Sequence, residues 1–310
     1  MYIAITKLDP QGNLLWRRYI SSGSSWYISI TGVDIDSEDK VTFLITRFGA
    51  SIINLGTIDS AGVIHFFPNS VQNTLGLTFN KALRTSNGEI VAVGMVSQTY
   101  DISSACYFRF SATGDTLATA FWPVDQGSQY YKAEAYDLAL MDNGNLLVTC
   151  SLNSTSRTLL EINLNGFVVS RYDIPGEMQL YVVPICREPN SQSYLIAYRM
   201  GESPNNSIFI DRFENGVFEP LFTIPTSYLS FVSSMILGTD AIYLCGTFGI
   251  NASLVSLSYA GVVNWSRNQQ GSNVCDYINA GFGSYSTALL GIDDAGCVYW
   301  AWGNVGEQVI

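Results

Sequence analysis

Short apolar runs separated by tight polar turns alternate along the whole chain. The first example is residues 4–20, AITKLDPQGNLLWRRYI, in which a polar DPQG separates two apolar segments. Turns of this composition between apolar runs are the strongest short-range signal for a β-hairpin. No segment repeats apolar residues at a sustained helical spacing between capping residues. The pattern therefore predicts an all-β protein in which one hairpin follows another.

The opening hairpin recurs along the chain at a nearly constant interval. Similar segments include INLGTIDSAGVIHFF, LLEINLNGFVVSRYD and LVSLSYAGVVNWSRN, and the glycine of the turn aligns them. Repeats of about 50 residues that each hold one supersecondary unit are typical of propellers and solenoids. The turn glycines are Gly12, Gly62, Gly114, Gly166, Gly216 and Gly261, at intervals of 50, 52, 52, 50 and 45 residues.

A second hairpin lies between each pair of copies, for example GVDIDSEDKVTFLIT and YDLALMDNGNLLVTC. Its second strand, as in IVAVG or LLVTC, is apolar almost continuously rather than at alternate positions, which is typical of strands covered on both faces. Four short strands per repeat, packed between neighbours, predict a six-bladed β-propeller with four antiparallel strands per blade. The turns of this second hairpin centre near Asp39, Gly88, Gly144, Ser191, Thr239 and Gly296.

The two ends of the chain carry the two halves of one repeat. The chain begins with an outer (third and fourth strand) hairpin at residues 2–19. It ends with an inner (first and second strand) hairpin at residues 284–302. If the two pair in one blade, the ring closes through backbone hydrogen bonds and no sheet edge stays open at the seam. We therefore expect one domain spanning residues 1–310.

Three segments carry a resemblance to known proteins. GVDIDSEDKVTFLIT, ALMDNGNLLVTCS and AITKLDPQGNLLWRR resemble the repeat units of bacterial β-propeller proteins, and the resemblance covers nearly the whole chain. It implies the fold and no chemistry, because the matching positions are turn and core residues. Such repeats also occur in virion proteins of tailed bacteriophages. The Ser-, Thr-, Asn- and Tyr-rich, Lys-poor composition is similar to that of phage tail and capsid-fibre proteins.

The net charge and the length of the apolar runs each exclude one class of partner. The sequence has 15 lysine and arginine residues against 26 aspartate and glutamate residues, a net charge of −11. A nucleic-acid footprint needs clustered basic residues, so we expect no nucleic-acid binding. No apolar run reaches the length of a transmembrane helix, so we expect no membrane insertion. No signal peptide follows Met1, which favours synthesis in the bacterial cytoplasm. The alternative of a secreted chain whose leader has been removed is left open by the sequence.

Residues that could perform catalysis are sparse. His65 is the only histidine and falls on an expected outer strand, so a histidine-based metal site or catalytic triad has no residues to use. The acidic run Asp34–Asp39 and the pair Asp293–Asp294 lack the glycine of a calcium loop. Trp300 and Trp302 in YWAW are expected in a blade core. We predict no catalytic residues, no metal and no cofactor, and a protein that is not an enzyme.

The cysteines do not form CxxC pairs, which excludes zinc ribbons and thioredoxin-like redox motifs. Most of them lie in apolar runs and are expected to be reduced and buried, as in a reducing cytoplasm. These are Cys106, Cys150, Cys186, Cys245 and Cys297.

Aromatic residues gather in the longer connections between repeats, opposite the tight turns. Long loops on a rigid scaffold often bind partners, and exposed tyrosine and tryptophan supply contact area at low entropy cost. Alternatively, such rings would cover the ends of the blade cores. The predicted binding residues are Trp26, Tyr27, Trp122, Tyr130, Tyr131, Tyr228 and Tyr277.

These features together predict a non-enzymatic structural or binding propeller, a bacteriophage virion component of the tail, fibre or capsid decoration. Its expected partners are other virion proteins or a protein or glycan of the host surface, and a homo-oligomer stays open. The alternative is a bacterial propeller enzyme or a periplasmic ligand-binding protein that lacks its leader.

Overall fold

The computed structural model shows regular structure that is entirely β, with no helix among the described residues. None of the described segments therefore forms a helix long and apolar enough to cross a membrane. The structure describes residues 2–21, 27–35, 40–48, 52–72, 77–97, 102–122, 131–152, 157–175, 182–200, 207–248, 251–270, 287–292 and 297–304.

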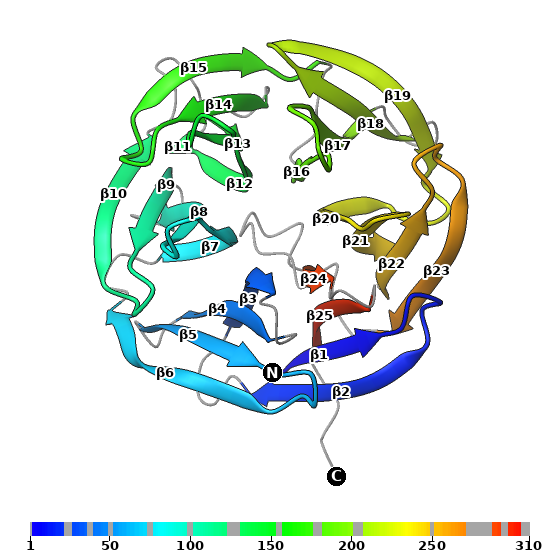
Figure 1. The fold of residues 1–310 in the computed structure, drawn as a ribbon, viewed down its shortest axis with the longest axis horizontal. Coiled ribbons are helices and arrows are strands. Elements are labelled where there is room, and N and C mark those ends of the chain that lie inside the picture. Colours follow the sequence, from blue (N-terminus) through cyan, green and yellow to red (C-terminus); the bar gives the residue numbers. More distant parts are fainter. Residues whose placement is uncertain are drawn as a thin grey trace.

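Six antiparallel sheets stand around a common axis as the blades of a propeller (Figure 1). The first strand of each blade is innermost and the fourth is outermost, as the apolar pattern predicts. Blades 1 to 3 are built as follows. Blade 1 contains β3 (Tyr27–Ile35), β4 (Val41–Phe48), β5 (Ile52–Ile58) and β6 (Ile64–Gln72). Blade 2 contains β7 (Leu77–Arg84), β8 (Ile90–Ser97), β9 (Ile102–Phe110) and β10 (Thr116–Trp122), and the short β11 (Tyr131–Lys132) pairs with β9 beyond the end of β10. Blade 3 contains β12 (Glu134–Leu140), β13 (Leu146–Ser151), β14 (Thr158–Ile162) and β15 (Val168–Asp173).

The remaining blades complete the ring with the same order of strands. Blade 4 contains β16 (Ile185–Arg187), β17 (Tyr194–Met200), β18 (Ser207–Glu214) and β19 (Val217–Pro225). Blade 5 contains β20 (Phe231–Leu237), β21 (Ile242–Phe248), β22 (Asn251–Leu257) and β23 (Val263–Gln270). Blade 6 contains β24 (Thr287–Ile292), β25 (Val298–Asn304), β1 (Tyr2–Leu8) and β2 (Leu14–Ser21).

Blade 6 joins the two ends of the chain, which confirms the predicted closure. Strand β1 pairs antiparallel with β25, from Tyr2 opposite Asn304 to Leu8 opposite Val298. The N-terminal hairpin therefore satisfies the backbone edge of β25, which would otherwise be open to association.

The core lies between neighbouring blades. Strand β13 is buried at every position, and Val148 packs with Val93 of blade 2 and Leu138 of β12 in one apolar cluster. Both faces of the sheet are covered, which explains why the second strands carry apolar residues on both faces. Fully burying one such side chain stabilises the fold by about 1.5–3 kcal/mol.

The turns between third and fourth strands interlock around the ring. Their glycines have positive φ, a region that costs a residue with a β-carbon about 1–2 kcal/mol. At Gly62, Gly166, Gly216 and Gly261, the residue six positions after the turn glycine of the preceding blade packs over the glycine, whereas Trp265 packs over Gly12. A β-carbon on Gly62 would lie 2.9 Å from Nε of Arg18, and one on Gly261 would lie 2.7 Å from the ring of Phe222. Glycine is therefore required at these turns for two reasons, the positive φ and the close approach of a neighbouring side chain. These turns, together with those between the first and second strands, form one face of the ring, which we call the turn face.

Candidate functional site

Trp122 does not lie on an exposed loop as predicted. It ends β10, where its backbone pairs with Ala105, and only 8% of the residue is exposed. Its indole Nε1 donates a hydrogen bond to the carbonyl oxygen of Gly166 in blade 3, at 3.2 Å. The predicted placement on an exposed loop is therefore wrong, because β10 continues further than expected, and the ring joins two blades.

Of the other predicted binding residues, only the side chain of Tyr228 is described. It is half-buried in the turn after β19 and packs on the core between blades 4 and 5, as the covering alternative predicts. The backbones of Tyr27 and Tyr131 lie in β3 and β11. For the rest, the predicted binding surface stays a prediction. Trp26, Tyr130 and Tyr277 lie outside the described residues.

His65 lies exposed on the outer strand β6, away from the axis, as predicted. Cys106, Cys150, Cys245 and Cys297 are buried, which confirms their assignment to blade cores, whereas Cys186 is half-buried.

The structure describes only some of the other residues that the sequence analysis considered for metal binding or catalysis. Within the described part of the chain, no three or more histidine, cysteine, aspartate or glutamate side chains gather as a metal site would require. The backbone of Asp34 lies in β3 and those of Trp300 and Trp302 in β25. Residues 36–39, Cys275, Asp293 and Asp294 lie outside the described residues.

Sequence reasoning missed an ion pair between the innermost strands of two blades. Nζ of Lys81 on β7 lies 3.7 Å from Oδ1 of Asp137 on β12. The lysine side chain is 20% exposed and the aspartate side chain 4% exposed. Both residues directly follow a β-bulge, at Asn80 and Tyr136, where the pairing with the second strand shifts by one residue. Bulges of this kind redirect side chains and are common beside active sites.

Asp137 connects three blades. Its Oδ2 accepts a hydrogen bond at 3.0 Å from the backbone N–H of Ile185 on β16, and its Oδ1 accepts one at 2.7 Å from Leu138. Burial raises the pKa of Asp137, although the Lys81 ammonium and these N–H groups act in the opposite direction. Burial alone would lower the pKa of Lys81, but the Asp137 carboxylate raises it above its usual value, so the lysine stays charged at neutral pH.

Further polar side chains extend this site along the inner strands. Asn80 donates through Nδ2 to Oε1 of Glu134 at 2.8 Å and to the carbonyl oxygen of Ala135 at 2.9 Å. Cys186 on β16 donates its thiol hydrogen to the carbonyl oxygen of Met235 in blade 5, at 2.9 Å. Burial raises the pKa of this thiol to about 12, so it is neutral. We call Asn80, Lys81, Glu134, Asp137 and Cys186 the axial cluster.

The axial cluster combines the ammonium group of a partly exposed lysine side chain with two carboxylates. A fixed cation can stabilise negative charge that develops on an oxygen, and a carboxylate can accept or return a proton. A sequence signal existed: Lys81 and Asp137 each stand seven residues before the turn glycine of their hairpin, Gly88 and Gly144. Opposite charges at equivalent positions of neighbouring blades predict a pair.

Comparison with known proteins supports the fold. No family model matches the chain, and no curated protein matches it. Among solved structures, TolB of Acinetobacter baumannii is 15% identical with a TM-score of 0.54, over 86% of this chain and 63% of TolB. A gluconolactonase of Xanthomonas campestris is 8% identical with a TM-score of 0.51, over 88% of this chain and 85% of the enzyme. A glucose dehydrogenase is 10% identical with a TM-score of 0.50, over 90% and 100% of the two chains.

These likenesses correct the prediction that the chain is not an enzyme. Propellers of the same architecture are named as a gluconolactonase and a glucose dehydrogenase, so a single histidine on an outer strand gives no ground for excluding catalysis. They offer no support for a phage virion role and agree better with the alternative, a bacterial propeller enzyme or ligand-binding protein. The partners and the location in a virion stay predictions.

Proposed function

We propose that this protein is a propeller enzyme that hydrolyses a lactone or ester of a small polyhydroxylated acid at the axial cluster. The observation that supports it is the ion pair between Lys81 and Asp137, which holds the ammonium group of a partly exposed lysine side chain between the innermost strands of two blades. A gluconolactonase on the same scaffold, named above, suggests this class of substrate.

In the proposed reaction, Glu134 accepts a proton from a water molecule while the water oxygen attacks the carbonyl carbon of the substrate. The carbonyl oxygen becomes negatively charged, and the Lys81 ammonium stabilises it. The intermediate then collapses, the bond from the carbonyl carbon to the ester oxygen breaks, and Glu134 returns its proton to the leaving oxygen. The products are the free carboxylic acid and the hydroxyl group, and the side chain is restored.

The surrounding contacts suit these roles. Asn80 donates to Oε1 of Glu134 and fixes the carboxylate, which is only partly buried. Asp137 keeps Lys81 charged and in place, and is itself held by the backbone N–H of Ile185. Asp137 is thus a positioning residue, since both its oxygens already accept hydrogen bonds from the protein.

The test measures the hydrolysis of glucono-δ-lactone and of a panel of γ- and δ-lactones and aryl esters. Proton release reports the rate. Glu134→Gln should lower kcat at least about a hundredfold, the usual range for loss of a general base. The double variant Lys81→Met/Asp137→Asn removes both charges without leaving a buried carboxylate alone, and should have the same effect.

Asp173→Asn is the matched control, because it makes the same acid-to-amide change at an exposed position on the outer strand β15. It should leave the rate unchanged, and thermal melting should show that all variants fold. Folded wild-type protein that turns over none of the panel, or axial variants with unchanged rates, would contradict the proposal.

A further inference from the structure

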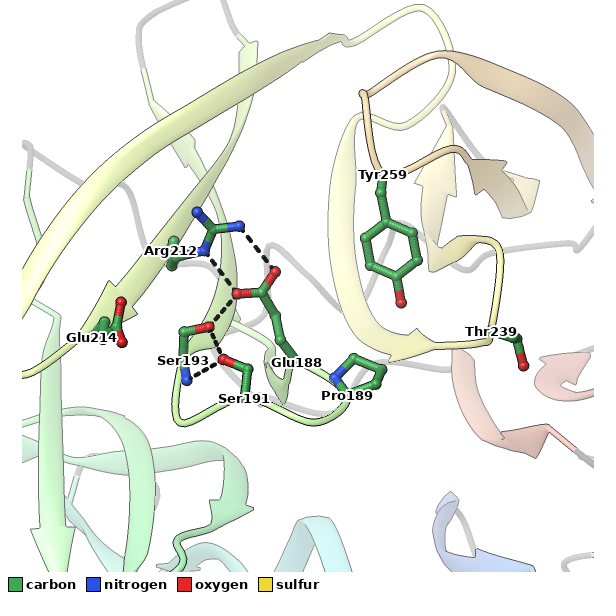
Figure 2. A pocket seen from close by; sticks show the side chains of 8 residues that line it. All are labelled: Glu188, Pro189, Ser191, Ser193, Arg212, Glu214, Thr239 and Tyr259. Carbon is green, nitrogen blue, oxygen red and sulfur yellow. Dashed lines mark hydrogen bonds and ion pairs between the residues drawn. The ribbon is translucent and has the colours of Figure 1, made fainter.

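A separate pocket opens on the turn face, between blades 4 and 5. Figure 2 shows that its lining side chains come from turns of both blades and from the end of β18, and its volume is ≈ 500 Å³. This volume falls within the range of about 300–1,000 Å³ that is usual for small-molecule sites. None of its lining residues belongs to the axial cluster.

One wall of the pocket is a rigid, planar ion pair. Arg212 on β18 donates from Nε to Oε2 of Glu188 at 2.7 Å and from Nη2 to Oε1 at 3.1 Å. Ser193 also donates to this carboxylate, and its hydroxyl lies 2.5 Å from that of Ser191. Such a bidentate pair fixes the orientation of both groups and presents a flat polar surface.

The opposite wall is aromatic. Tyr259 lies in the turn between β22 and β23 and is 37% exposed, and Figure 2 shows its ring across the pocket from Glu188 and Arg212. Its hydroxyl donates to the carbonyl oxygen of Gly238 at 2.8 Å, which ties it to the neighbouring turn. The accessible ring and the flat ion pair therefore face one another without needing to reorganise.

The charge around the pocket is negative. Among the lining residues, Glu188 and Glu214 face Arg212 as the one basic side chain, and Glu219 approaches Arg212 to 3.6 Å. Three carboxylates against one guanidinium disfavour an acidic ligand. The hydroxyl groups of Ser191 and Thr239 add neutral polar groups along the same rim.

We propose that this pocket binds a sugar ring that carries no negative charge. The aromatic ring of Tyr259 offers a surface for the apolar C–H face of a pyranose. Glu214, Thr239 and Ser191 offer hydrogen-bond partners for its hydroxyl groups. An amino sugar fits as well as a neutral one, because the surplus carboxylates favour a cation. The site is independent of the proposed hydrolytic activity, since it shares no residue with the axial cluster.

The experiment compares three sugars that share one ring but differ in charge: neutral glucose, cationic glucosamine and anionic glucuronate. Saturation-transfer NMR on the full chain at neutral pH should detect glucose and glucosamine. Glucuronate should bind at least about fivefold more weakly than glucose, because of like-charge repulsion in the pocket. Glu214→Gln should narrow this difference to about twofold, because it removes one of the repelling carboxylates.

Substitutions on the aromatic wall test the contact itself. Tyr259→Ala should abolish the saturation transfer, whereas Tyr259→Phe, which keeps the ring, should retain it. The matched control is Val262→Ala, in the same turn and 64% exposed, which should behave as wild type. The proposal is overturned if none of the sugars gives a signal, if glucuronate binds most tightly, or if Tyr259→Ala and Val262→Ala bind alike. The axial variants Glu134→Gln and Lys81→Met/Asp137→Asn should bind the sugars normally, so failure of either proposal can be recognised separately.

Discussion

The indole Nε1 of Trp265 donates a hydrogen bond to the carbonyl oxygen of Pro10 at 3.0 Å, across 255 residues of sequence. Two residues further along β23, Arg267 donates from Nε to the carbonyl oxygen of Gly12, also at 3.0 Å. Trp16 and Arg18 repeat both bonds onto the next blade, at Ser60 and Gly62. Hydrogen bonds from side chains of blade 5 to the first turn of the chain thus help to close the ring, in addition to the mixed sheet of blade 6.

We expect Trp265→Phe to weaken this closure. The substitution keeps an aromatic ring over Gly12 but removes the donor to Pro10, a loss of about 1 kcal/mol in the free energy of unfolding. Urea denaturation would measure it. Phe167→Leu, at a 69% exposed position of another turn, is the control and should leave the midpoint unchanged. Equal stability of the two variants would show that the bond to Pro10 contributes nothing to closure.

Deletion of residues 2–21 should have a much larger effect. It removes β1 and β2 and exposes the edge of β25, whose backbone pairs with β1 along seven residues. An exposed, apolar edge strand invites association between chains. Size-exclusion chromatography should find the truncated chain aggregated. A monomeric truncated chain with an unchanged melting temperature would contradict the closing role of the N-terminal hairpin.

The fold could be predicted because its signals are local and repeated. A turn glycine such as Gly62 has to adopt positive φ and receive a side chain of the preceding blade, so it marks every repeat at the same place. Continuous apolar runs identify the second strands, since both of their faces are covered. The count of hairpins and the position of the ends then leave one way to close the ring.

The candidate site could not be predicted in the same way. Its polar residues are single exceptions in apolar strands, and their meeting depends on bulges at Asn80 and Tyr136 that shift the register by one residue. The predicted loop placement of Trp122 is wrong for a related reason, because the end of β10 could not be placed from composition alone. The pocket beside Tyr259 needs the relative placement of two blades, which no single repeat encodes.

The ion pair of the turn-face pocket should make stability depend on pH. Hydrogen bonds from Arg212 and Ser193 hold the pKa of Glu188 below its usual range. The unfolded chain then binds more protons than the folded one near the ordinary glutamate pKa of about 4.3, so this contribution is complete above that pH and is lost as pH falls through the lower folded value.

Urea denaturation between pH 3 and 6 would test this dependence. The difference in unfolding free energy between wild type and Glu188→Gln should shrink as pH falls, because the variant has no charge to lose. Asp173→Asn, an acid-to-amide change at a 79% exposed side chain outside the pocket, is the control and should follow wild type. A constant difference between wild type and Glu188→Gln over this range would contradict the assigned role of the carboxylate.

Removing one member of the axial ion pair should lower the free energy of unfolding more than removing both. Lys81→Met leaves Asp137 charged with a 4% exposed side chain, and we expect a loss of about 3–5 kcal/mol in unfolding free energy. Asp137→Asn should cost less, because the amide oxygen still accepts from Ile185 and the partly exposed Lys81 can turn to water. In the double variant the methionine adds apolar contact and no charge is left alone, so its loss should be smaller than that of Lys81→Met. A double-mutant cycle by urea denaturation measures the coupling. Additive losses would mean that the two charges, 3.7 Å apart, do not stabilise each other in the folded chain.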